Sequence, residues 1–232
     1  IGKTTPESWV TKNGAHVLFV RRSQVPMVDV RVLVKAGSAY DNKHPGIASM
    51  TSDLLDQGAN GKNAKALSIE FDRVGSIYSA QIDKDKATLS LKMLSDKNSI
   101  KRSIENLSVI LSKPDFTKQS INLIKNEHKL LVKINNQNPT YRAICVLYRE
   151  IYANNPYGHS VLGTKKSISL INRNDILDFY KKHFVASNID IVIVGDISNK
   201  KAHKISQKIS ASLKKGRQTP SPEITGSSRK NI

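Results

Sequence analysis

The sequence has one cysteine, few aromatic residues and no long apolar run. The single cysteine, Cys145, excludes an internal disulfide. It lies in a helical pattern with no His or Asp placed to activate its thiol, so we expect a small buried apolar residue, not a nucleophile. A transmembrane helix is excluded because no run of about 18 apolar residues is present. The 38% of apolar residues in 232 positions are still enough for a globular core.

Acidic residues are also scarce, with 19 Asp and Glu against 37 Lys and Arg, which gives a formal net charge of +18. From residue 200 onward the only acid is Glu223. The basic residues are not interleaved with aromatic ones, and no nucleic-acid motif accompanies them. We therefore expect a solvated basic face and no specific nucleic-acid partner. The basic residues of this region are Lys200, Lys201, Lys204, Lys208, Lys214, Lys215, Arg217, Arg229 and Lys230.

Alternation of apolar and polar residues predicts several strands. The valines at positions 28, 30, 32 and 34 alternate with other residues, and residues 16–22 form the preceding strand. The segments 77–82 and 87–94 are two strands joined by a short polar connection, which predicts a hairpin. The run NIDIVIVGDI, residues 188–197, is nearly all apolar and predicts a strand buried on both faces.

Elsewhere the apolar period changes to that of a helix. Strands come in pairs and helices are grouped, which favours an α+β, two-layer domain with a mainly antiparallel sheet packed against helices. The expected helices cover residues 47–55, 63–74, 100–111, 116–133, 140–153, 174–183 and 199–213.

The composition changes near residue 216, where Gly, Pro, Ser and Thr become frequent. We expect one domain over residues 1–215 and a linker over 216–232 that leads to a further C-terminal domain. The first residue is Ile1, not Met, which is expected of a processed protein or a fragment.

The stretch GIASMTSDLL, residues 46–55, predicts a helix with one polar face. Ser49, Ser52 and Asp53 stand at i, i+3 and i+4, so they share that face. The spacing is that of a metal-binding helix. However, serine hydroxyls are poor zinc ligands, and one carboxylate does not complete a site. We therefore expect the polar face to be solvated.

Two longer segments together resemble a known family. They are WVTKNGAHVLFVRRSQVPMVDVRVLVKAGSAYDNKHPGIASMTSDLLDQGA and NPYGHSVLGTKKSISLINRNDILDFYKKHFVASNIDIVIVGDIS. The chain resembles, over about residues 8–215, one half of a pitrilysin/insulinase-family zinc peptidase. This group, the inverzincins, includes the mitochondrial processing peptidases and their bacterial relatives. The resemblance implies the α+β half-domain of that family.

Active members carry H-x-x-E-H on the helix that matches residues 46–55. Aligned on Gly46, the first His falls on Ser49, the Glu on Ser52 and the second His on Asp53. The third ligand, a Glu on a later helix, is expected near Lys129 or Leu131. The resemblance therefore implies vacated catalytic positions, no cofactor in this chain, and zinc in a partner subunit.

A residual metal site is the alternative to this interpretation. Asp53, Glu127 and His128 can approach one another if their two helices pack as in the family. The remaining histidines show no ligand spacing, and we expect His159 and His183 to be surface or hydrogen-bonded residues. The others are His16, His44 and His203.

The resemblance implies the N-terminal half of a zinc-free, bacterial-type subunit. Such a subunit binds peptides and pairs with a zinc-bearing subunit as a heterodimer for proteolysis, in the periplasm or after export. The strand expected to hold the substrate comprises Ile77, Tyr78, Ser79, Ala80, Gln81 and Ile82. The alternatives are a scaffold subunit of a larger assembly, a binder of nucleic acid or anionic surfaces, and an active zinc peptidase with substituted ligands.

Overall fold

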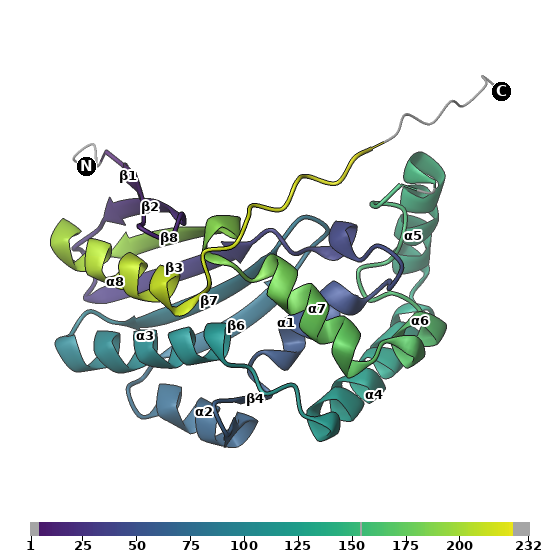
Figure 1. Ribbon diagram of the computed structural model, residues 1–232, viewed down its shortest axis with the longest axis horizontal. Coiled ribbons are helices and arrows are strands. Elements are labelled where there is room, and N and C mark those ends of the chain that lie inside the picture. Colours follow the sequence, from purple (N-terminus) through teal and green to yellow (C-terminus); the bar gives the residue numbers. More distant parts are fainter. Residues whose placement is uncertain (1–4, 154, 225–232) are drawn as a thin grey trace.

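A six-stranded sheet forms the centre of the protein. The computed structural model describes residues 5–153 and 155–224. The strands follow the order β1-β2-β8-β3-β7-β6, so β1 and β6 are the two edges (Figure 1). Two further short strands, β4 (Gly58–Ala59) and β5 (Lys62–Asn63), pair with each other. The sheet strands are β1 (Glu7–Val10), β2 (His16–Arg21), β3 (Met27–Val34), β6 (Ile77–Ile82), β7 (Ala87–Leu94) and β8 (Ile189–Gly195).

The strand pairing confirms the prediction of a mainly antiparallel sheet. β6 and β7 form the predicted hairpin, and β3 lies antiparallel between β7 and β8. The consecutive strands β2 and β3 do not pair, because β8 inserts between them and runs parallel to β2. A strand late in the sequence is thus hydrogen-bonded to a strand near its beginning.

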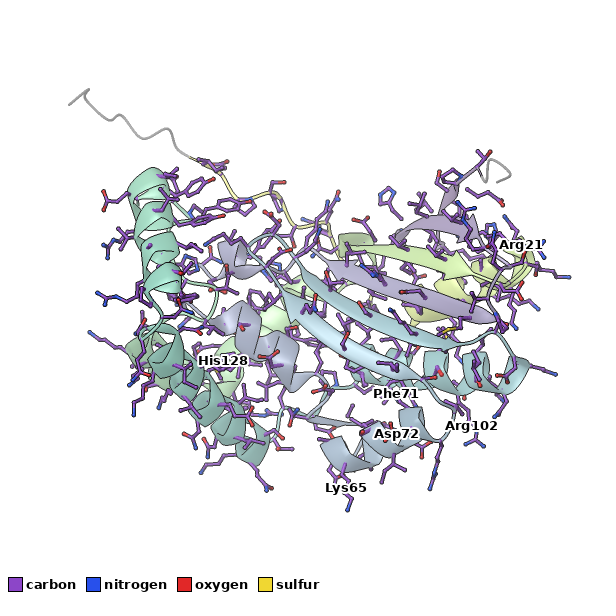
Figure 2. The ribbon with its side chains drawn as sticks, turned by 180° about the vertical axis from the view of Figure 1, so that it is seen from behind. Arg21, Lys65, Phe71, Asp72, Arg102 and His128 are labelled. Carbon is purple, nitrogen blue, oxygen red and sulfur yellow. The ribbon has the colours of Figure 1, made fainter. Side chains whose placement is uncertain are left out.

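The prediction that β8 is buried on both faces was wrong. Ile189, Ile191 and Ile193 are buried, whereas Asp190, Val192 and Val194 are half-buried. The helices α3 (Lys97–Ser112) and α8 (Asn199–Ser212) pack against each other and against strands of the sheet on the same side (Figure 1). Figure 2 looks onto the other, more open side. A continuous apolar sequence does not show whether a strand is buried on both faces or on only one.

The helices match the predicted segments with shifts of a few residues at their ends. The sequence pattern missed one short helix, α6, and two 3-10 turns at Ser38–Tyr40 and Ala186–Asn188. The helices are α1 (Ile47–Leu54), α2 (Ala64–Asp72), α3 (Lys97–Ser112), α4 (Lys118–Asn135), α5 (Pro139–Tyr152), α6 (Lys165–Leu170), α7 (Arg173–His183) and α8 (Asn199–Ser212).

Helix α1 lies in the middle of the fold, in contact with α4, α7 and β6. Asp41 fixes its first turn, because the carboxylate accepts hydrogen bonds from Gly46 N at 2.7 Å and Ala48 N at 2.9 Å. Gly46 has φ +98, and a Cβ there would lie 2.6 Å from the carbonyl oxygen of Leu162. Only glycine fits this entry into the helix, so the position of α1 is fixed at its N-terminus.

The expectation that Cys145 is a buried apolar residue was also wrong. It is half-buried, because α5 stands at one end of the molecule, away from the sheet (Figure 1). Helix α5 has no fully buried residue. Its amphipathic pattern is therefore not explained by packing against the described part of this chain.

The chain stays attached to the domain beyond the predicted boundary at residue 215. Ala186 N donates to the carbonyl oxygen of Lys214 at 2.8 Å, and Thr219 N donates to Asn188 Oδ1 at 3.0 Å. The last eight residues of the predicted linker, 225–232, lie outside the described residues. The linker and the further domain remain predictions.

A buried histidine under this C-terminal segment predicts a pH-dependent stability. His183 is 1% exposed, its Nδ1 lies 3.2 Å from Thr219 Oγ1, and burial, helped by nearby Lys182, lowers its pKa to about 4. The unfolded chain binds a proton near pH 6.5, so the folded state loses stability as the pH falls from 6.5 toward 4. Replacement His183→Gln should reduce the loss between pH 7 and pH 4.5 by about 2 kcal/mol. Urea unfolding at both pH values measures this, and an unchanged loss would contradict the assignment.

Candidate functional site

Two serines of α1 face the interior. Ser49 is 0% exposed and Ser52 is 1% exposed, and neither side-chain oxygen has a hydrogen-bond partner in the described protein. The expectation of a solvated face was therefore wrong for both serines. The reason is that α1 is enclosed by α4, α7 and β6, so the face that is polar in sequence is covered by other elements. Buried polar atoms without partners are rare in folded proteins.

Asp53 is directly bonded to a histidine of α4. Its Oδ2 lies 2.7 Å from His128 Nε2. The His128 side chain is 2% exposed and that of Asp53 is 40% exposed, so the pair reaches from the interior to the surface. The carboxylate accepts from the ring, which places the proton of a neutral His128 on Nε2. The other ring nitrogen, Nδ1, is buried without a partner.

His128 is the residue of α4 that stands opposite Asp53, and it precedes the position predicted for the third ligand. Sequence alignment placed that position at Lys129 or Leu131. Each step along a helix turns the side chain by about 100°, so an error of one residue changes the face. Leu131 is 43% exposed and therefore points away from the site, whereas His128 is buried against α1. Figure 2 labels His128 on α4, beside α1.

The residues at this place do not fit a zinc ion. Glu127 is exposed and does not join Asp53 and His128, and the described residues contain no group of three His, Cys, Asp or Glu side chains able to hold a metal. The hydroxyls of Ser49 and Ser52 are weak neutral ligands. Neither hydroxyl can replace the glutamate that takes a proton from a metal-bound water. The structure thus brings together two of the three residues of the alternative metal site and leaves the third outside.

The strand expected to bind substrate lies beside this place. β6 covers residues 77–82 and is an edge of the sheet, so its outer side has no partner strand in the described chain. Ile77, Ser79 and Gln81 are exposed. An edge of this kind can hydrogen-bond an added extended chain. The free edge of β6 therefore lies next to α1.

Tyr78 connects β6 to the interior of the site. Its ring stacks on Phe71 with centroids 5.4 Å apart, and its hydroxyl is buried without a hydrogen-bond partner. Burial, with a smaller effect of the Asp56 and Asp53 carboxylates, raises the pKa of Tyr78 well above its ordinary value. The phenol therefore stays neutral and serves as a packing group, not as a base.

Sequence reasoning missed Asp41 and its partner. Besides capping α1, Asp41 lies 3.0 Å from His159 Nε2, and its side chain is completely buried. This agrees with the expectation that His159 is hydrogen-bonded. An Asp five residues before a glycine-led helix is a capping signal that the sequence carries, but its histidine partner, 118 positions later, is not readable from it.

Comparison with known proteins agrees with this architecture. The profile of the family described as insulinase (peptidase family M16) matches residues 16–165, and the profile described as peptidase M16 inactive domain matches residues 170–231. The chain belongs to the M16, or insulinase, peptidase family. The predicted family is therefore confirmed.

Curated relatives include both peptidases and a non-peptidase. An uncharacterized zinc protease of Rickettsia felis is 26% identical over 94% of this chain and 53% of its own length. A probable mitochondrial-processing peptidase subunit beta of Schizosaccharomyces pombe is 24% identical over 87% of this chain and 44% of its own length. The non-peptidase homolog YmxG of Helicobacter pylori is 21% identical over 78% and 42%. The chain spans about half the length of the curated relatives it matches.

Solved structures confirm the fold. A peptidase M16 inactive domain from Pseudomonas fluorescens has a TM-score of 0.92 and 33% identity, and the match covers 94% of this chain and 53% of that one. The periplasmic protease PqqL from Escherichia coli has a TM-score of 0.86 at 14% identity, over 97% and 26% of the two chains. The second similarity shows the fold alone.

The Asp53–His128 hydrogen bond should be measurable as a coupling between two helices. Replacing Asp53 with Ala leaves a buried imidazole N–H without an acceptor, which costs about 1–3 kcal/mol. In a double-mutant cycle with Asp53→Ala and His128→Leu, we expect the double variant to recover about 1 kcal/mol relative to additivity. Urea unfolding of the four proteins gives the coupling.

The matched control is the surface pair Glu105 and Lys208, whose charged atoms lie 2.8 Å apart and whose side chains are 44% and 45% exposed. Its coupling should be smaller, about 0.5 kcal/mol or less, because solvent screens it. Equal coupling in the two cycles would show that the pair in the site has no special structural role.

Proposed function

We propose that this protein is a non-catalytic M16 homologue that binds peptides and works with a zinc-bearing subunit of the same family. The observation that supports this most directly is the Asp53–His128 hydrogen bond of 2.7 Å, at the place where the family resemblance locates the zinc of active members. A direct hydrogen bond joins the two helices there, and the family resemblance aligns Ser52 with the catalytic glutamate. The serine hydroxyl cannot serve as the base.

Peptide binding is proposed along the outer edge of β6. An extended peptide added there would form backbone hydrogen bonds, which recognise a peptide largely independently of its side chains. The overall charge of +18 would favour acidic peptides by electrostatic attraction. The free edge and its position beside α1 support this proposal.

The partner is proposed to supply the metal and the catalytic glutamate. In support, one curated relative is named as a subunit of a processing peptidase and another as a non-peptidase homolog. A periplasmic or exported location is proposed with support from the similarity in fold to a periplasmic protease. Every helix of the described residues is too short or too polar to span a membrane.

The proposal predicts binding without cleavage. A fluorescent acidic peptide should bind to this chain and stay intact during long incubation. Methylation of alternate backbone nitrogens of the peptide should weaken binding at least tenfold, because the methyl groups remove hydrogen-bond donors and block the edge of the added strand. Fluorescence anisotropy measures binding, and mass spectrometry measures cleavage. Turnover of the peptide by this chain alone would contradict the proposal.

The two sheet edges offer a matched control for the place of binding. In a Cys145→Ser background, a nitroxide is attached at Ser79→Cys on β6 or at Ser8→Cys on β1, both exposed positions. The label on β6 should broaden the NMR signals of the bound peptide, and the label on β1 should not. Equal broadening, or broadening from β1 alone, would place the peptide elsewhere.

A further inference from the structure

Two neighbouring helices on one side of the sheet carry a large excess of positive charge. Helices α3 and α8 lie side by side there (Figure 1). Together they contain seven Lys and Arg residues and a single acid, Glu105, whereas the whole chain has 37 bases and 19 acids. The imbalance on these helices is therefore greater than in the chain as a whole. The seven bases are Lys97, Lys101 and Arg102 on α3 and Lys200, Lys201, Lys204 and Lys208 on α8.

The lysines of α8 form an exposed row. Lys200, Lys204 and Lys208 follow one another at spacings of four residues, which places them on one face of the helix. All three are exposed, because the opposite face of α8 is buried against the sheet. Like charges at this spacing repel one another and destabilise the helix. An external negative charge that neutralises the row would relieve this repulsion.

The basic residues of the two helices adjoin each other. Lys208 Nζ lies 2.8 Å from Glu105 Oε1 on α3, and Lys201 Nζ donates to the carbonyl oxygen of Ser95, just before α3, at 3.4 Å. The hydrogen bond from Lys208, with a smaller effect of the Lys101 charge, lowers the pKa of Glu105. Bases from both helices thus converge on one carboxylate, so the two helices present one continuous basic surface.

The acids that border this surface lie at its margin. Asp96 caps α3, where its carboxylate accepts hydrogen bonds from the backbone N–H groups of residues 98 and 99. Glu7 accepts a hydrogen bond from the side chain of Asn199, the first residue of α8. Negative charges are favourable at the N-terminus of a helix. The outer surface beyond the first turns of both helices stays basic, apart from Glu105.

The surface offers charge but no anchor for a shaped partner. None of the exposed large apolar side chains of the described residues lies on α3 or α8. The exposed ring on α8, His203, is already stacked on Trp9 with centroids 3.8 Å apart. Protein interfaces use apolar and aromatic anchors, and single-stranded nucleic acids use free rings on which bases stack. A bilayer with anionic headgroups needs neither, because it presents a broad surface of negative charge.

We propose that the outer surface of α3 and α8 is a docking surface for a bilayer of anionic lipids, to which the domain attaches by electrostatic attraction. Each lysine close to such a bilayer contributes about fivefold to the partition coefficient. Because α3 and α8 cover one face of the sheet, attachment would leave the other face, seen in Figure 2, directed away from the lipid. The attachment does not require a peptide on β6.

Vesicle sedimentation without peptide tests the proposal. At low salt the protein should sediment with vesicles that contain equal amounts of phosphatidylglycerol and phosphatidylcholine, and not with vesicles of phosphatidylcholine alone. Binding should be lost at about 0.5 M salt, because the screening length there falls to a few ångströms.

Charge reversal locates the surface. The triple variant Lys101→Glu/Lys200→Glu/Lys204→Glu should bind the anionic vesicles at least tenfold more weakly, since it replaces three attractive charges by repulsive ones. All three side chains are exposed, so the fold should persist, and far-UV circular dichroism checks this. The neutral variant Lys101→Gln/Lys200→Gln/Lys204→Gln should lose less.

The matched control lowers the net charge by the same amount elsewhere. It replaces exposed bases of α4, α5 and α6, which lie at the other end of the molecule (Figure 1). Its binding should fall about threefold or less, because these bases do not face the lipid. The control variant is Lys133→Glu/Arg142→Glu/Lys166→Glu.

Contact quenching reports the orientation on the vesicle. In a Cys145→Ser background, a fluorophore is attached at Ala211→Cys on α8 or at Ser79→Cys on β6, both exposed positions. A nitroxide on the lipid headgroup should quench the label on α8 strongly and the label on β6 weakly.

Four results would overturn the proposal. They are equal binding to anionic and neutral vesicles, equal loss in the two charge-reversed variants, equal or stronger quenching of the label on β6, and tighter binding to a soluble polyanion than to the vesicles at equal concentration of negative charge. Random-sequence duplex DNA and polyglutamate are the soluble polyanions used. Preference for one of them would identify a nucleic acid or an acidic protein as the occupant.

Discussion

The fold depends on how helix α1 is held at its two ends while other elements surround it. The helix is nearly all buried, so each polar atom on it needs a partner or lowers the stability. Asp41 binds two N–H groups of the first turn, and Asp53 binds His128 near the other end. These contacts come from the preceding loop and from α4, so they fix α1 relative to both. The position of β6 beside it follows from the same packing.

The hydrogen bond between Asp53 and His128 joins α1 directly to α4 in this M16 fold. In active members zinc joins the helix that carries H-x-x-E-H to the later helix that carries the third ligand. Here the later helix supplies a histidine and the first helix a carboxylate, and the two bond directly. The strand β6, which is proposed to bind peptides, lies next to α1, whereas the hydroxyls of Ser49 and Ser52 are poor bases.

Much of this architecture is predictable from the sequence because it depends on local periodicity. The alternating valines of β3, the hairpin of β6 and β7 and the glycine-led start of α1 all depend on neighbouring residues, and all three were correct. Which face a residue occupies depends on distant packing. The sequence therefore did not reveal the half-buried face of β8, the burial of Ser49, or the exposure of α5 around Cys145. The partnership of Asp53 with His128 was recognised only as one possibility, because a shift of one residue on α4 changes the facing side chain.

The zinc content of the purified protein tests the central claim most directly. After incubation with zinc and dialysis, elemental analysis should find far less than one zinc per chain, with the same value in Asp53→Asn and His128→Gln variants. About one zinc per chain that both substitutions remove would show that Asp53 and His128 bind metal, and would contradict the account of a metal-free hydrogen bond between α1 and α4.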